Sequence, residues 1–321
     1  MFKDFKMAYY SFIVEAEDEG AVLPSNKVSL FFQKEFKEIL HRHACKMQKN
    51  ECGDCLLKFH CAYALMYENL ASTSQGFRRY GSVPAPFVWK PPLEKKTDYF
   101  KGEKIIFNLV LLGKGTEYAE LLIRIFQQFV QKGLTVGKGK LDLKSVLAEN
   151  PFTGEQQLIY GDGADNISKT AVYIKGNQVE DWARENSTSK SFSLLFLAPA
   201  LIAEEDEYLH DPRFFLILRE LLKRVQMIYY FHHDFLELEL EISYHEVIEK
   251  AKKVQIKKNQ VTFSNADKLN KNTADNLPGL LGKVDYTGDN KEGYLPFLKL
   301  GEFIHLGHKA ELGYGRYRLR T

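Results

Sequence analysis

The sequence predicts an α+β protein made of two tandem domains, each with the order βαββαβ and an antiparallel sheet covered by helices on one face. Three observations support this prediction. The chain has 321 residues, about twice the length of an average domain. Its composition, 45% hydrophobic and 27% charged, is typical of a globular protein. Runs of β-branched and aromatic residues alternate with amphipathic segments, and their order repeats in outline in the second half.

Aromatic and β-branched residues near the N-terminus predict a strand, which ends at the turn-forming residues around Gly20. Helical spacing then relates the apolar residues Leu30, Phe31, Phe36, Ile39 and Leu40. A glycine suited to a helix C-cap, Gly133, follows the second amphipathic segment. The elements expected in the first half are a strand at 8–17, a helix at 27–43, a strand at 104–112, a helix at 117–132, and strands at 140–147 and 156–160.

The polar, glycine-containing stretch 161–186 is expected to connect the domains. The elements expected after it are a strand at 191–202, a helix at 211–230, one or two strands within 247–263, a strand at 280–286, a helix at 294–304 and a strand at 314–319. For residues 247–254 the pattern leaves helix and strand open. We therefore expect a ferredoxin-like (RRM-like) domain at 1–165, with a cysteine-bearing insertion at 45–61, and a second at 187–321, with a glycine-rich loop at 307–315.

The formal net charge is only +2, so the charge of the whole molecule does not indicate a nucleic-acid partner. Any basic surface must be local, and lysines gather at 250–258 and arginines at 316–320. Residues 1–6 lack the continuous apolar core of a signal peptide, and no apolar run approaches the roughly 20 residues of a membrane span. We therefore expect a cytoplasmic protein that has no membrane partner.

Three glycines, Gly307, Gly313 and Gly315, fall within nine positions between a predicted helix and the last strand. Glycine permits positive φ and close approach of another chain, and the exposed N–H groups of such a segment can bind phosphate oxygens. Lys309 and Arg316 supply positive charge beside them. The segment is thus a candidate cradle for RNA, although a tight turn that enters a strand has the same pattern.

Three motifs of the second half resemble CRISPR-associated RAMP endoribonucleases that cut pre-crRNA. These are LPGLLGKV at 277–284, YLPFLKLGEFIHLG at 294–307 and GYGRY at 313–317. Weaker resemblance extends to residues 107–129, to the glycines at 137–139 and to the cysteine block. The resemblance implies two ferredoxin-like domains and CRISPR repeat RNA, or pre-crRNA, as partner. Subunits of a CRISPR effector complex are further candidate partners, and monomer and homodimer both stay open.

The resemblance also implies a reaction that needs no metal ion, in which the 2′-hydroxyl attacks the scissile phosphate and leaves a cyclic phosphate. Such a reaction needs a base, an acid and positive charge on the phosphorane, and histidine and lysine suit these roles. The family places its catalytic histidine in or just after the first helix. This implies His41 or His43, about 200° apart on a helix, with His305 as another candidate and Lys27 as the cation. The residues implied in RNA binding are Gly307, Lys309, Gly313, Tyr314, Gly315 and Arg316.

One departure from the family pattern leaves an alternative open. The glycine-serine pair usual before the first helix is replaced by Asn26-Lys27-Val28-Ser29. Bulkier residues there would hinder close approach of RNA, so a non-catalytic RAMP subunit that binds RNA is the alternative function.

All four cysteines, Cys45, Cys52, Cys55 and Cys61, lie in one 17-residue window with the pattern C-x₆-C-x₂-C-x₅-C. In a reducing compartment this spacing favours a metal site over disulfides. Four thiolates suit structural zinc, with an iron–sulfur cluster as the alternative and four buried thiols as the simplest explanation. A closed shell of four cysteines leaves no open position for catalysis. A metal-stabilised interaction module without an RNA role would share these features.

Overall fold

A computed structural model of the chain describes residues 1–2, 4–23, 28–47, 52–68, 82–94, 96–135, 139–161, 166–204, 207–233, 243–264, 277–289 and 293–321. The chain forms two compact units. The N-terminal unit comprises Lys6–Ile174 together with Phe231–His233. The C-terminal unit comprises Met1–Phe5, Lys175–Tyr230 and 234–321. The first residues of the chain therefore belong to the C-terminal unit, where the ring of Phe2 packs edge-on against Phe297 at 5.2 Å.

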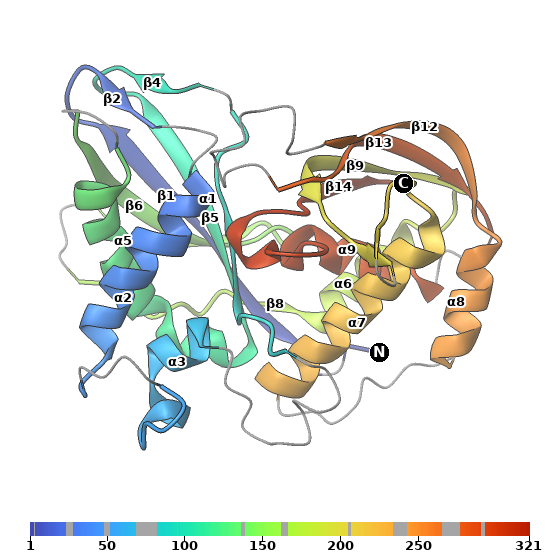
Figure 1. Cartoon of the computed structure of the whole chain (residues 1–321), viewed down its shortest axis with the longest axis horizontal. Helices are drawn as coiled ribbons and strands as arrows, with labels where there is room; N and C mark the ends of the chain where they lie inside the picture. The colour runs from blue at the N-terminus through green and yellow to red at the C-terminus, as the bar shows by residue number, and fades with distance from the viewer. Residues whose placement is uncertain are drawn as a thin grey trace. The chain divides into compact units, whose positions relative to one another are not determined.

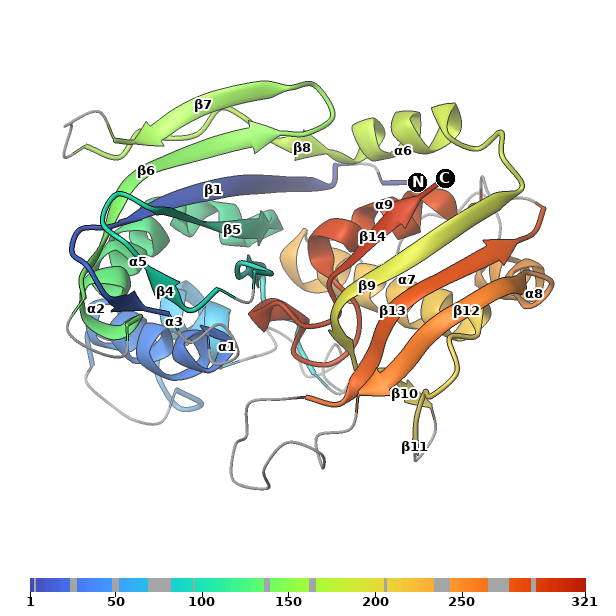
Figure 2. The same cartoon turned by 90° about the horizontal axis from the view of Figure 1, so that it is seen from above.

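The N-terminal unit has a main β-sheet with helices on one face and, apart from it, a sheet of two short strands (Figures 1 and 2). Its strands are β1 (Lys6–Ala16), β2 (Ala21–Val22), β3 (Phe87–Lys90), β4 (Asp98–Tyr99), β5 (Lys104–Leu112), β6 (Leu141–Asn150), β7 (Glu155–Tyr160) and, at its end, β8 (Ile174–Lys175). Its helices are α1 (Val28–Phe31), the π-helical η1 (Phe32–Phe36), α2 (Lys37–Ala44), α3 (Ala62–Tyr67) and α5 (Ala119–Gly133), with 3₁₀ turns η2 (Lys58–His60) and η3 (Gly113–Tyr118). The main sheet has the order β3-β5-β1-β6-β7, and β8 pairs with β1. The four strands β3-β5-β1-β6 and the helices α2 and α5 make up the βαββαβ unit.

A cluster of aromatic side chains fills the space between this sheet and its helices. The rings of Phe32 and Trp89 stack at 4.5 Å, and Phe12 and Phe126 lie 4.5 Å apart. The first helix departs from regular geometry, because η1 is a π-helix that shifts the helical phase. Phe32 is consequently buried whereas Phe31 is only partly buried, although regular spacing predicted Phe31 for the core.

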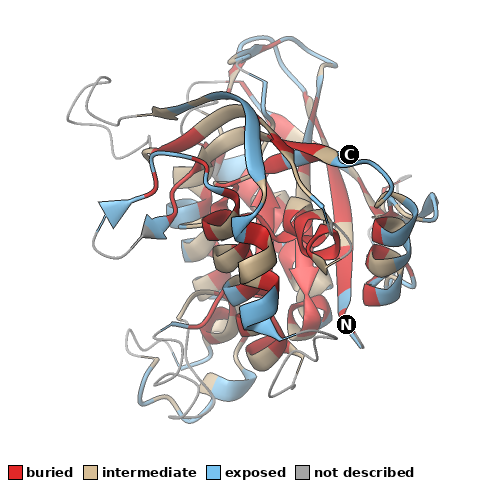
Figure 3. Ribbon diagram, turned by 90° about the vertical axis from the view of Figure 1, so that its right-hand side faces the viewer, coloured by how far each residue is buried: buried red, intermediate tan, exposed pale blue. Residues whose placement is uncertain are grey.

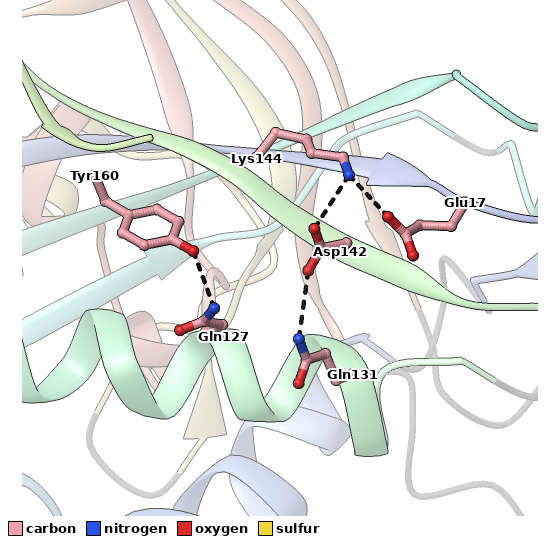
Figure 4. A network of polar contacts seen from close by, with 6 residues as sticks. All are labelled: Glu17, Gln127, Gln131, Asp142, Lys144 and Tyr160. Atoms are coloured by element: carbon pink, nitrogen blue, oxygen red, sulfur yellow. Dashed lines mark hydrogen bonds and ion pairs between the residues drawn. The ribbon is translucent and has the colours of Figure 1, made fainter. Parts of the chain in front are cut away.

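A polar network on the surface joins α5 to the sheet (Figure 4). Lys144 of β6 lies 2.8 Å from Glu17 and 3.1 Å from Asp142, and hydrogen bonds to these carboxylates raise the pKa of Lys144. Gln131 of α5 donates to Asp142 at 3.4 Å, and Gln127 donates to the hydroxyl of Tyr160 at 3.0 Å. Exposed ion pairs stabilise little, so the network orients α5 on its sheet more than it strengthens the fold.

The C-terminal unit repeats the same topology. Its strands are β9 (Ser191–Ala200), β10 (Ala203–Glu204), β11 (Glu207–Tyr208), β12 (Gln255–Ser264), β13 (Gly279–Thr287) and β14 (Tyr317–Arg320). Its helices are α6 (Gly176–Glu185), α7 (Phe214–His232, whose last two residues belong to the N-terminal unit), α8 (Tyr244–Lys252), α9 (Leu295–Ile304) and the 3₁₀ turn η6 (Ala310–Leu312). The antiparallel order β12-β13-β9-β14 corresponds to β3-β5-β1-β6 of the first unit (Figure 2). The prediction of an α+β chain with two ferredoxin-like folds is therefore confirmed.

One local prediction was wrong, and one alternative that the sequence left open is decided. Residues 161–186, expected as a connecting stretch, contain the ten-residue helix α6. Residues 247–254, for which a strand was considered, lie mainly in α8, which begins at a capping box where Ser243 accepts from the backbone N–H of Glu246 and Glu246 accepts from that of Ser243. The lysines at 250–253 therefore lie at the end of a helix, where positive charge favours the helix dipole.

Buried residues, red in Figure 3, are concentrated in the strands and on the inner sides of the helices, and exposed residues at the loops and outer turns. In the C-terminal unit, the hydroxyls of two buried tyrosines form hydrogen bonds to the backbone of other segments. Tyr286 donates to Pro212 O and Tyr317 donates to Leu298 O, both at 2.6 Å. None of the helices in the described residues combines the length and the apolar character that crossing a bilayer requires.

Candidate active site

One face of α2 carries His41 and Lys37 at a spacing of four residues, which places both side chains against α3. The partly buried ring of His41 meets that of Tyr63 edge-on, with the centroids 4.4 Å apart. Lys37 Nζ lies 5.6 Å from the ring centroids of both Tyr63 and Tyr67, and 3.5 Å from Glu68 Oε1. Histidine, ammonium and phenol are thus held together by the packing of two helices.

The phenol of Tyr63 is protonated near neutral pH. Burial raises the pKa of its phenol, and the hydrogen bond to Glu68 raises that pKa further. Tyr63 therefore keeps its proton and packs against the imidazole of His41. Because α3 begins immediately after Cys61, the position of the Tyr63 ring depends on the cysteine-bearing segment.

The other histidine of the helix, His43, is exposed and projects toward α5 instead. Its Nε2 lies 2.9 Å from Oε1 of Gln128. An amide oxygen accepts, so Nε2 carries the proton in the neutral ring and Nδ1 keeps the lone pair. The expected difference in direction between His41 and His43 is therefore present: His41 contacts Tyr63 of α3, and His43 contacts Gln128 of α5.

The glycine-rich segment of the C-terminal unit is a tightly wound connection between α9 and β14. Gly307, Gly313 and Gly315 all have positive φ, as does Lys309, which stands just before η6. A Cβ on Gly307 would lie 2.3 Å from Leu201 O, and one on Gly315 only 1.7 Å from Leu306 O. These two glycines are needed because other parts of the same chain pass against them.

Backbone N–H groups of this segment are largely used within the fold. Those of Leu306 and Gly315 donate to Gly315 O and Pro199 O, and that of His308 donates to Leu201 O at 2.9 Å. Gly313 and Gly315 are themselves buried. The segment can therefore contact RNA mainly through its outward side chains, because few of its backbone N–H groups are available to bind phosphate. These side chains are the exposed His308 and the partly exposed Lys309, Tyr314 and Arg316.

Arg224 of α7 holds the start of the segment in place. Its Nε donates to the carbonyl oxygen of Ile304, one of the last carbonyls of α9, at 2.9 Å. Burial lowers the pKa of the guanidinium, while the nearby Glu311 and Glu220 act in the opposite direction. His305, the next residue of the chain, is completely buried, so its ring does not reach solvent.

The remaining predicted residues lie in separate places. Lys27 lies outside the described residues. The four cysteines line one pocket at the end of α2. The sequence did not indicate Lys37, Tyr63 or Arg224 as site residues. For Lys37, the spacing of four residues from His41 was the available signal.

A polar pocket of about 530 Å³ in the C-terminal unit is lined by Lys190, Lys250, Lys253, Gln255, Thr287, Gly288 and Asp289.

Comparison with known families decides the identity. A family model described as CRISPR-associated endoribonuclease Cas6 matches residues 194–317, the part that contains the glycine-rich segment. A second model, the AF_1859_N N-terminal domain, matches residues 5–172, more than half of the chain. Residues 194–317 thus carry the domain of the Cas6 family of CRISPR-associated endoribonucleases, as the C-terminal motifs predict. The chain is a RAMP-type endoribonuclease that processes pre-crRNA.

Solved Cas6 structures share the fold of the whole chain. A Cas6 product complex aligns over 98% of this chain and 100% of its own, with 18% identity and a TM-score of 0.52. A Thermus thermophilus Cas6 aligns over 98% and 99%, with 14% identity and a TM-score of 0.54. A partial Cas6-RT-Cas1–Cas2 complex aligns over 98% of this chain but 46% of its own, with 11% identity and a TM-score of 0.58. No curated protein matches the sequence.

Proposed function

We propose that the chain binds CRISPR repeat RNA and cleaves it without a metal ion, with His41 as the general base. The 2′-oxygen gives its proton to the imidazole and attacks the phosphorus. The bond to the 5′-oxygen breaks, and this oxygen leaves with a proton from solvent or a second side chain. The products are a 2′,3′-cyclic phosphate and a 5′-hydroxyl. The observation that carries the proposal is the placement of His41 beside Lys37 on one helix face.

The chemistry of these side chains suits the roles. Imidazole titrates near neutral pH, and proton transfer by a positioned base is worth roughly 10²–10⁴-fold in rate. The ammonium of Lys37 can stabilise the additional negative charge of the phosphorane. The family pattern implied Lys27 for this role. His305 is not among the proposed catalytic residues, because its side chain is buried. His43 is the alternative candidate for the base, because its ring is exposed.

Cleavage of the repeat RNA is expected to proceed in excess EDTA at the rate seen without it. The full-length chain is incubated with RNA that carries the repeat of its own locus, and the products are resolved before and after phosphatase treatment that removes a cyclic phosphate. A 2′,3′-cyclic end with a 5′-hydroxyl supports the proposal. A 5′-phosphate product would overturn it, and so would loss of cleavage on chelation in a chain that keeps any metal bound to its cysteines. Tight binding without cleavage would indicate the alternative, a non-catalytic RNA-binding subunit.

Lys309→Gln is expected to weaken RNA binding and reduce its salt dependence. Each phosphate contact that is lost should flatten the slope of log K against log salt by about 0.7 for single-stranded RNA. Lys101→Gln, which removes an exposed lysine in a turn, is the matched control and should leave the slope unchanged. Binding is measured by fluorescence anisotropy over a salt series. Equal slopes for Lys309→Gln and the unmodified chain would exclude Lys309 from the phosphate contacts.

A further inference from the structure

Four cysteine side chains surround one pocket of about 210 Å³ in the N-terminal unit. Cys45 is the C-cap of α2, and Cys61 is the N-cap of α3. Cys52 and Cys55 lie between the helices in a turn closed by a hydrogen bond from the N–H of Cys55 to Cys52 O at 3.2 Å. The window of four cysteines seen in the sequence thus corresponds to one place in the fold, where α2 ends and α3 begins.

The segment that carries the cysteines has little hydrophobic support. Leu56 is 94% exposed, Phe59 57% and Met47 47%. Within 45–47 and 52–61 no residue is buried. Ordering a segment costs conformational entropy, and burial of apolar side chains usually offsets this cost. Some other interaction must hold this segment against the helices.

The thiols themselves are the candidates for that interaction. The side chains of all four cysteines line the same pocket, between the last turn of α2 and the first turn of α3. Their chemistry, four soft sulfur donors without a carboxylate, fits a thiophilic ion. In the described segments no three His, Cys, Asp or Glu side chains are already placed to hold a metal ion. Ligand sets of this kind rarely form before binding, because the binding energy of the ion itself orders the segment.

We propose that Cys45, Cys52, Cys55 and Cys61 bind one Zn²⁺ through four thiolates and that this site clamps the end of α2 to the start of α3. Four thiolates complete a tetrahedral shell, so no position remains for water and the ion has a structural role. Binding releases the thiol protons to solvent. Since Tyr63 of α3 contacts the ring of His41 on α2, the clamp fixes the imidazole; this last step rests on the proposed function.

Metal analysis of the full-length chain, purified and kept in a phosphine reductant, tests the site without RNA. We expect about one zinc per chain, falling to near zero in Cys52→Ser and Cys55→Ser. His60→Ala is the control, because His60 lines the same pocket and should not be needed. Absence of metal from the unmodified chain would overturn the proposal. Iron with visible absorption would overturn the zinc assignment, and zinc loss in His60→Ala would overturn the four-thiolate set.

Amide hydrogen exchange tests the clamp. Cys52 and Cys55 lie in neither α2 nor α3, so their replacement by serine changes no residue of either helix. In both variants the amides of residues 39–45 and 62–68 should exchange at least about tenfold faster, while those of β1 and β5 stay unchanged. Unchanged exchange in a variant that has lost its zinc would overturn the clamp. Faster exchange in a chain that does not cleave RNA would leave the clamp standing and remove only the proposed function.

Discussion

Replacing His41 by alanine is expected to slow cleavage of repeat RNA by about 10²–10⁴-fold and to change RNA affinity by no more than about twofold. The imidazole is the proposed base, and its removal leaves the 2′-hydroxyl without a positioned proton acceptor. The packing loss is small, because the ring is only partly buried and touches Tyr63 at its edge. Single-turnover rates and equilibrium binding, measured on the same preparations, separate the two effects.

His43→Ala provides the matched control for this experiment, since it removes an imidazole two residues away from the same helix. It also breaks the contact with Gln128, so any general loosening of α2 should appear in this variant as well. Cleavage by His43→Ala should stay within about threefold of the unmodified rate. The opposite outcome, with His41→Ala active and His43→Ala inactive, would assign the base to His43 and leave Lys37 without its proposed role.

Gly315→Ala is expected to destabilise the C-terminal unit by about 3–5 kcal/mol. Two costs add at this position. The backbone has φ +65°, where an alanine is strained, and the new Cβ would stand 1.7 Å from Leu306 O, so the connection between α9 and β14 must move. Hydrogen exchange followed over denaturant concentration reports the stability of this unit separately from that of the other.

Gly154→Ala isolates the conformational cost from the steric one. Gly154 has φ +75°, nearly the same conformation, but no atom lies within 4 Å of the position that a Cβ would take there. Only the conformational strain, about 1 kcal/mol, is then expected. If Gly315→Ala costs no more than Gly154→Ala, the close approach to Leu306 is not what requires glycine there. If Gly315→Ala is as stable as the unmodified chain but binds RNA more weakly, Gly315 contacts RNA directly, as the sequence analysis suggested.

The order of strands and helices could be predicted from the sequence, since it depends on local periodicity. The long elements β1, β5, α5, α7 and α9 all lie close to where apolar spacing placed them. The prediction failed at α6, which buries only Gly176, Val179 and Ala183. It gave β12 only as one or two strands within 247–263, because six of the ten residues of β12 in succession are exposed. β12 is a strand because its backbone pairs with β13, which no alternation of its side chains could reveal.

The sequence by itself also determined the family motifs, the grouping of the cysteines and the two histidines of the first helix, because each is a matter of residue type and spacing. Only the tertiary structure decided what these residues contact. A π-helical turn changed the phase of the helix, packing of α3 brought Tyr63 to His41, and burial removed His305 from solvent. The glycines of the C-terminal segment proved to accommodate the chain's own backbone. Contacts between residues far apart in sequence depend on how elements pack, and local spacing carries no record of that packing.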